Sequence, residues 1–160
     1  MFEILNLKIE NKLINYLNSR FGIDKAIFNN YSFFKNGKKV FILSKQNKID
    51  ILKILNLENL ETIGLELFAN YKEYLLSSLA FTMFDSKTIC ENYIILNREQ
   101  TKKYFRSEKI LFEDISLKNK KILSYGNIVG IYNNKIIGIL EYTKNKEFIS
   151  NNIIRNLDVK

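Results

Sequence analysis

The chain has 160 residues, of which 46% are hydrophobic, so it is long enough to form one domain of ordinary size or two small ones. It contains no histidine and a single cysteine, Cys90, which excludes the usual zinc sites, histidine acid–base catalysis and an internal disulfide. The formal net charge is +8, and every apolar run is far shorter than the roughly 18 residues of a membrane span, so we expect a soluble, cytoplasmic protein that attracts polyanions.

Helices and strands are predicted to alternate at the start of the chain. Apolar residues at helical spacing predict a helix over 9–21, and Gly22 is a natural stop for it. Strands are predicted at 31–35 and 40–44 around Asn36-Gly37, because Asn-Gly is the strongest short hairpin signal. A helix capped by Ser44 is expected at about 46–56.

A third strand and a second long helix are predicted next. The strand covers 61–69, where Gly64 indicates a bulge or a close approach of two backbones. Asn70 and Glu73 have the form of a capping box, which predicts a helix over 71–84. We interpret its apolar stripe as packing rather than as a ligand groove; its members are Leu75, Leu76, Leu79, Ala80 and Met83.

The polar segment at 85–87 is interpreted as the boundary between two domains, 1–86 and 87–160. The first contains 11 basic and 9 acidic residues, and the second contains 14 and 8. A compositional bias toward lysine and asparagine raises the lysine count everywhere, but it does not explain why the excess lies in the second half.

One short helix among short strands is predicted for the second half, which is typical of a small barrel or sandwich. A strand is expected at 89–96, with Cys90 packed in it. A capping box at Asn97 and Gln100 opens a helix that runs to about Lys109, anchored by Tyr104 and Phe105. A loop follows at 110–120. Asn133-Asn134-Lys135 predicts a tight hairpin turn, and the remaining strands are expected at 121–125, 128–132, 136–142 and 153–157.

Several of these segments resemble known domains. In the second half they are ENYIIL, REQTKKYFRSEKI, IVGIYNNKIIGIL with its Gly138, and IIRNLDV. In this order they resemble a PUA domain, a small pseudobarrel that binds structured RNA. In the first half, FFKNGKKVFILSK and ETIGLELF resemble strands of a pre-PUA domain. The resemblance implies an α+β fold, with an N-terminal α/β pre-PUA domain at 1–86 and a C-terminal PUA β-pseudobarrel at 87–160.

The combination resembles a small family of ribosome-biogenesis factors that act on the large subunit and bind pre-rRNA without catalysis. The resemblance implies RNA as the partner, either rRNA or tRNA, together with ribosome-assembly proteins, and no membrane. Two positions depart from the family pattern, because Ser107 and Leu140 stand where it favours glycine. A related pattern occurs in the PUA-like tail of Sun-family RNA 5-methylcytosine methyltransferases. An alternative is therefore a stand-alone RNA-recruiting module that works with a separate RNA methyltransferase.

The first candidate RNA-binding set lies on the predicted helix at 98–109. It comprises Lys102, Lys103, Arg106 and Lys109. The spacing of Lys102, Arg106 and Lys109 predicts that they share one helical face, where they could contact consecutive phosphates. The alternative is a solvated helix face.

Two further candidate sets lie later in the chain. Lys144, Lys146 and Arg155 form the first, and the resemblance implies RNA contact for Arg155 because it precedes an Asn-Leu pair. The second consists of Lys118, Lys120 and Lys121, for which a solvated loop is the alternative. Tyr125, Tyr132 and Tyr142 could stack on unpaired bases, although we favour core packing for them.

No catalytic residue, metal or cofactor is predicted. Glu108, Glu113 and Asp114 form one local carboxylate cluster, which we interpret as ion-pair partners of neighbouring cations. Cys90 has no histidine to activate it as a nucleophile. A hypothesis of another class is a protein–protein adaptor that uses the apolar face of the 71–84 helix.

Overall fold

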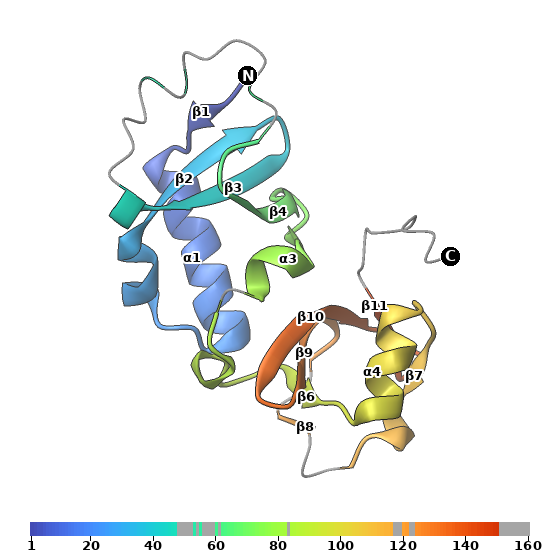
Figure 1. The fold of residues 1–160 in the computed structure, drawn as a ribbon. Coiled ribbons are helices and arrows are strands. Elements are labelled where there is room, and N and C mark those ends of the chain that lie inside the picture. The colour runs from blue at the N-terminus through green and yellow to red at the C-terminus, as the bar shows by residue number, and fades with distance from the viewer. Residues whose placement is uncertain are drawn as a thin grey trace. The chain divides into compact units, whose positions relative to one another are not determined.

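The computed structural model describes residues 1–47, 53, 55, 60, 62–82, 84–116, 120–121 and 124–150. The chain is α+β and divides into two compact units, Met1–Ala80 and Phe81–Lys160, each with its own sheet (Figure 1). The sequence placed the domain boundary between residues 86 and 87. Within the described part of the chain, no helix has the length and apolar character required to cross a bilayer.

The first unit is built on an antiparallel sheet whose strands follow chain order, β1-β2-β3-β4-β5. The strands are β1 (Glu3–Ile4), β2 (Tyr31–Asn36), β3 (Lys39–Ser44), β4 (Leu65–Asn70) and β5 (Leu75–Leu76). The β2–β3 pair places Asn36 opposite Lys39, which confirms the predicted hairpin. Short 3₁₀ segments, η1 (Lys25–Asn30) and η2 (Lys45–Asn47), flank this hairpin, and most of the helix predicted at 46–56 lies outside the described residues.

Helix α1 (Leu7–Phe21) confirms the first predicted helix. The side chain of Asn6 caps its start by accepting a hydrogen bond from the Lys8 amide at 2.9 Å, and Gly22 ends it. Its buried side chains are Leu13, Leu17 and Phe21.

Gly64 confirms a predicted close approach of two backbones. Its φ is +65°, and a Cβ at this position would overlap the carbonyl oxygen of Ile42 on β3. Only glycine satisfies both conditions. The strand that follows, β4, begins at Leu65, later than predicted.

The prediction of a helix over 71–84 is wrong. The Asn70 side chain accepts from the Lys72 amide at 3.2 Å, and Tyr74 has a φ of 53°, so the chain turns back instead of coiling. Leu75 and Leu76 form β5 and pair with β4, and the helix that follows, α3, covers only Ser78–Phe81. An asparagine that accepts from the amide two residues ahead can start a turn as well as a helix. The adaptor hypothesis named the apolar face of this helix, which does not form as predicted.

The second unit contains a mixed sheet in the order β7-β11-β10-β9-β6-β8, curled as a half-barrel. After the 3₁₀ segment η3 (Ser86–Thr88), its elements are β6 (Tyr93–Ile95), α4 (Arg98–Phe105), β7 (Ile110–Leu111), η4 (Phe112–Asp114), β8 (Lys120–Lys121), β9 (Gly126–Tyr132), β10 (Lys135–Tyr142) and β11 (Glu147–Ser150). β6 runs parallel to β9, and the other pairs are antiparallel.

The second unit confirms the predicted hairpin turn, and several of its strands differ from the predicted ones. Positive φ angles of 48° and 60° at Asn133 and Asn134 confirm the predicted hairpin turn. The strand predicted at 89–96 is much shorter, and the segment predicted as a loop at 110–120 contains β7, η4 and the first residue of β8. β11 was not predicted, and the strand predicted at 153–157 lies outside the described residues.

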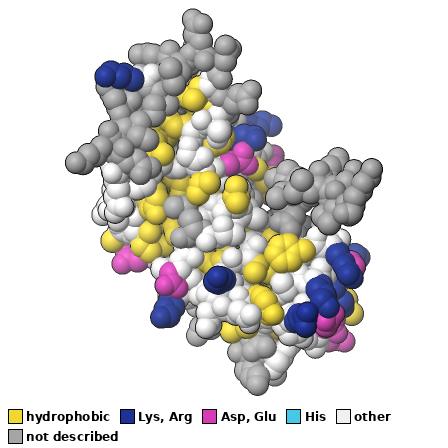
Figure 2. All heavy atoms as spheres, viewed as in Figure 1, with side chains coloured by type: hydrophobic (Ala, Val, Ile, Leu, Met, Phe, Trp, Pro, Cys, Tyr) yellow, Lys and Arg dark blue, Asp and Glu magenta, His cyan; other side chains and the backbone are white. Residues whose placement is uncertain are grey.

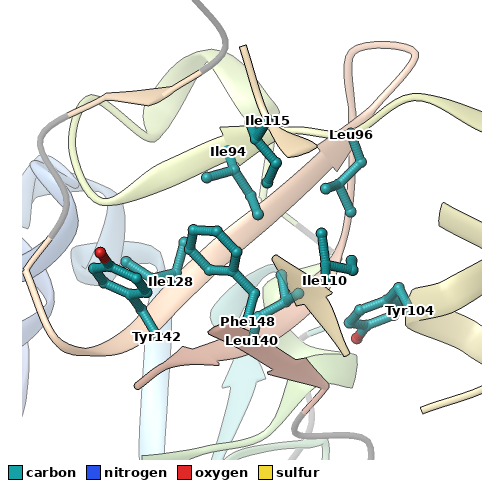
Figure 3. Packing of buried hydrophobic residues seen from close by; sticks show 9 residues of the cluster. All are labelled: Ile94, Leu96, Tyr104, Ile110, Ile115, Ile128, Leu140, Tyr142 and Phe148. Atoms are coloured by element: carbon teal, nitrogen blue, oxygen red, sulfur yellow. The ribbon is translucent and has the colours of Figure 1, made fainter. Parts of the chain in front are cut away.

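A single apolar cluster fills the half-barrel (Figure 3). Its members are Ile94, Leu96, Tyr104, Ile110, Ile115, Ile128, Leu140, Tyr142 and Phe148. Tyr104 is fully buried and anchors α4, as predicted, whereas Phe105 is 63% exposed, so its predicted anchoring role is wrong. Because residues from α4, β7, β10 and β11 meet in one cluster, the loops between these elements are held at defined places.

Candidate nucleic-acid interface

Helix α4 begins and ends with hydrogen-bonded caps. The predicted capping box is confirmed: the Asn97 side chain accepts from the Gln100 amide, and the Gln100 side chain accepts from the Asn97 amide, both at 2.9 Å. At the other end, the Glu108 amide donates to the Lys103 carbonyl at 2.9 Å and the Ser107 amide donates to the Tyr104 carbonyl at 3.1 Å. These two bonds, with Ser107 at a φ of 56°, form a Schellman motif.

The position of this cap corrects one predicted feature of the basic helix. Because the helix ends at Phe105, Arg106 is its C-cap and Lys109 lies beyond it. The prediction that Lys109 shares a helical face with Lys102 and Arg106 is therefore wrong. The four cations nevertheless stay on one continuous segment that leads from α4 into β7.

Each of these four cations has a carboxylate partner. The nitrogen–oxygen distances are 2.8 Å for Lys102–Glu99, 3.7 Å for Lys103–Asp114, 3.9 Å for Arg106–Glu108 and 3.0 Å for Lys109–Glu147. The predicted role of Glu108 and Asp114 as ion-pair partners is confirmed. The hydrogen bond from Lys102 lowers the pKa of Glu99. Exposed pairs of this kind contribute little to stability because water screens them, so a phosphate can replace the carboxylate at little cost.

The β10–β11 turn carries two more cations, Lys144 and Lys146, and both are exposed. The turn is closed by a bond from the Lys146 amide to the Thr143 carbonyl at 3.0 Å and by one from the Thr143 amide to the Glu147 carbonyl at 2.9 Å. Lys146 has a φ of 58°, in the left-handed region that favours glycine. Among the residues that the structure describes, neither lysine has an ion-pair partner.

Two contacts join this turn to the α4–β7 segment. The Phe112 amide donates to the Lys146 carbonyl at 2.9 Å, and the Lys109 ammonium contacts the Glu147 carboxylate at 3.0 Å. Pairing of β7 with β11 fixes both contacts. We call the resulting surface the basic edge; it consists of Lys102, Lys103, Arg106, Lys109, Lys144 and Lys146. Figure 2 shows Lys and Arg side chains gathered over α4, with acidic side chains between them.

The other predicted cations are not part of the basic edge as described. Lys120 and Lys121 form β8, which pairs with β6 at the opposite edge of the sheet from β7. Arg155 and Lys118 lie outside the described residues. The structure therefore brings the first candidate set together with Lys144 and Lys146, and it places the backbone of Lys120 and Lys121 elsewhere.

The three candidate tyrosines differ in exposure. Tyr142 is 8% exposed and belongs to the core, where burial raises the pKa of its phenol, and Tyr132 is half-buried. Core packing is thus confirmed for Tyr142. Tyr125 is 56% exposed and stacks on Tyr142 with 5.1 Å between ring centroids. Phe105 in this unit is also highly exposed. It was predicted to anchor the helix together with Tyr104, because the pattern does not distinguish two adjacent aromatic residues.

Across the described ranges, no group of three or more His, Cys, Asp and Glu residues could hold a metal ion. Cys90 is exposed and precedes β6, so its predicted packing within a strand is wrong.

No protein-family model matches the chain, and no curated protein sequence matches it.

Proposed function

We propose that the chain is a non-catalytic RNA-binding protein that contacts RNA along the basic edge of its second unit. The observation that carries the proposal is the junction of the α4–β7 segment with the β10–β11 turn, made by the Lys109–Glu147 and Phe112–Lys146 contacts. It joins six cations from two separate stretches of chain on one side of a rigid half-barrel. Such a row suits the sugar–phosphate backbone of RNA, because each cation that contacts a phosphate releases a bound counterion.

The order of elements in the second unit supports a PUA-like pseudobarrel preceded by a pre-PUA domain. One helix, α4, lies between β6 and β7, and the β9–β10 hairpin forms the middle of the sheet. On this basis we propose rRNA as the partner, bound during maturation or assembly of the large ribosomal subunit. Recognition would rest on phosphate contacts and RNA shape more than on base edges.

The ion pairs divide the basic edge into two classes of cation. Lys144 and Lys146 can meet a phosphate directly, whereas the four cations near α4 must first leave a carboxylate. The two lysines of the turn should therefore contribute most per residue to RNA affinity. The acids among the cations limit non-specific attraction, because they repel phosphates that do not fit between them.

Charge neutralisation tests the proposal. In the Lys144→Ala/Lys146→Ala double variant, the affinity for a fluorescein-labelled 12-nucleotide single-stranded RNA should fall about 25-fold at 0.1 M salt. The slope of log K against log salt should become less steep by about 1.4, which is about 0.7 for each lost contact. Alanine keeps the Cβ that lysine has at position 146, so the backbone strain stays the same. Fluorescence anisotropy measures both quantities.

The matched control is Lys25→Ala/Lys38→Ala, which removes two exposed lysines of the first unit and lowers the net charge equally. Its affinity should stay within about twofold of the parent protein, since it removes no contact on the basic edge. Equal losses in the two double variants would contradict the assignment of the basic edge. Crosslinking in cells, followed by sequencing of the bound RNA, tests the identity of the partner. Recovery of rRNA supports the proposed partner, and recovery of tRNA refutes it. Recovery of no RNA refutes RNA binding itself.

A further inference from the structure

A cluster of four stacked aromatic rings reaches from the core of the second unit to its surface. Within it, Phe112 stacks on Tyr142 at 5.6 Å as well as on Phe148. Phe112 and Phe148 lie 6.2 Å apart, Phe148 and Tyr142 4.8 Å, and Tyr142 and Tyr125 5.1 Å, with interplanar angles of 21°, 23° and 28°. Phe148 is fully buried, Tyr142 is nearly so, and Tyr125 is 56% exposed. Figure 3 shows Tyr142 and Phe148 among the core side chains. The outermost ring, Tyr125, therefore stacks on Tyr142, and more than half of this residue is exposed to solvent.

The backbone holds Tyr125 in this position. The next residue, Gly126, has a φ of 101° and lies opposite Tyr142 in the β9–β10 ladder. Because glycine has no side chain, the Tyr125 ring can reach across the strand pair to Tyr142. A ring that is already stacked on one face loses little further freedom when a second planar group covers the other face.

Positive charge lies at the same end of the strand pair. β10 ends at Tyr142, and the turn that carries Lys144 and Lys146 follows directly. The same turn is bonded through the Lys146 carbonyl to the amide of Phe112, a half-buried member of the ring cluster. An exposed ring at the same end of the strand pair as two lysines without a described ion-pair partner supplies the two elements of single-strand recognition: a stacking surface for a base and cations for nearby phosphates.

We propose that Tyr125 is a stacking platform for an unpaired RNA base and that the basic edge therefore binds single-stranded or bulged RNA in preference to a continuous duplex. The inference rests on the proposed RNA-binding function and names its substrate class. Stacking needs an exposed base face, which a duplex hides between neighbouring base pairs. Every base has such a face, so the platform gives selectivity for unpaired structure with little sequence preference.

Two substitutions and two probes test the platform by fluorescence anisotropy. The probes are a 12-nucleotide oligouridylate and an abasic oligonucleotide with the same number of phosphates. Tyr125→Ala should weaken oligouridylate binding by about five- to 150-fold, the range measured for loss of one base–aromatic stack, and should leave abasic binding unchanged. Tyr125→Phe keeps the ring and should bind both probes as the parent protein does.

A fluorescent variant reports stacking directly. The chain contains no tryptophan, so Tyr125→Trp introduces a single indole. Its emission should be quenched when oligouridylate binds and should stay unchanged with the abasic probe. Thermal unfolding of each variant checks that the second unit remains folded.

The outcomes separate the inference from the function on which it rests. If the parent protein binds both probes with equal affinity and Tyr125→Ala changes neither, Tyr125 is not a platform, although RNA binding by the basic edge stands. If the parent protein binds neither probe, the proposed function itself fails and the platform fails with it. Loss of abasic binding in Tyr125→Ala would also overturn the inference, because it would assign the effect to the phosphate contacts.

Discussion

Replacing Lys146 with glycine is expected to stabilise the second unit and to weaken RNA binding at the same time. Lys146 has a φ of 58°, and a residue with a Cβ loses about 1–2 kcal/mol in this conformation. Glycine avoids that strain but loses about 0.5–1 kcal/mol in backbone entropy on folding. The net gain is about 0.7 kcal/mol, which corresponds to about 3–6 °C in the melting temperature of a domain of this size. The variant also lacks one cation of the basic edge, so its affinity for single-stranded RNA should fall about fivefold at 0.1 M salt.

Two further variants isolate these effects. Lys146→Ala removes the charge and keeps the strain, so it should lose the same affinity without gaining stability. Ser107→Gly removes the same kind of strain at a φ of 56° and changes no charge, so it should gain stability at unchanged affinity. Calorimetry and fluorescence anisotropy measure the two quantities. The reasoning is refuted if Lys146→Gly binds RNA like the parent protein, or if it unfolds at a lower temperature.

Three other substitutions have defined outcomes. Glu147→Gln removes the carboxylate that pairs with Lys109 at 3.0 Å, so RNA affinity should rise up to about fivefold at 0.1 M salt; weaker binding would contradict the basic edge. Gly64→Ala places a Cβ against the Ile42 carbonyl at positive φ and should destabilise the first unit by about 2–4 kcal/mol in urea denaturation, so an unchanged midpoint would exclude the close approach. Burial raises the pKa of Tyr142 in the folded state. The contribution of the neutral phenol to the stability of the fold is therefore complete below the unfolded pKa of about 10, and it is lost as the pH rises through the higher folded value. Tyr142→Phe should therefore lose less stability than the parent protein between pH 10 and 11.5, as measured by urea denaturation at each pH; an equal loss would exclude this contribution.

Local signals in the sequence were reliable where side-chain and backbone bonds close within a few residues. The capping box at Asn97, the turn at Asn133-Asn134 and the close approach at Gly64 all occur as predicted. Asn70 shows the limit of such signals, because its bond to the amide two residues ahead suits both a turn and a helix. The choice is made by β4, on which Leu75 and Leu76 can be buried as a strand. That strand pairing is not encoded within the segment itself.

The candidate site was predictable as a set of cations but not as an arrangement. The Schellman motif that ends α4 places a serine, not the usual glycine, in the left-handed position, so no glycine marks the helix end and Lys109 was predicted to lie within the helix. The contact between Lys109 and Glu147 joins residues 38 positions apart. It depends on the register of β7 against β11, and neither of these short strands was predicted. The exposure of Tyr125 likewise follows from that fold and was not predicted from the residues around it in the sequence.

The parallel pairing of β6 with β9 constrains the order in which the second unit can form during synthesis on the ribosome. In the first unit, each described strand pairs with the next one in the chain, so its sheet can grow as the polypeptide emerges. β6 can pair with β8 first, but its other edge must wait for β9, since Tyr93 lies opposite Val129 and Ile94 opposite Gly130. Until then α4 and β6 expose their apolar side chains, and such intermediates aggregate readily. We therefore expect nascent chains that end before β9 to depend on chaperones, while the sheet of the first unit is already complete.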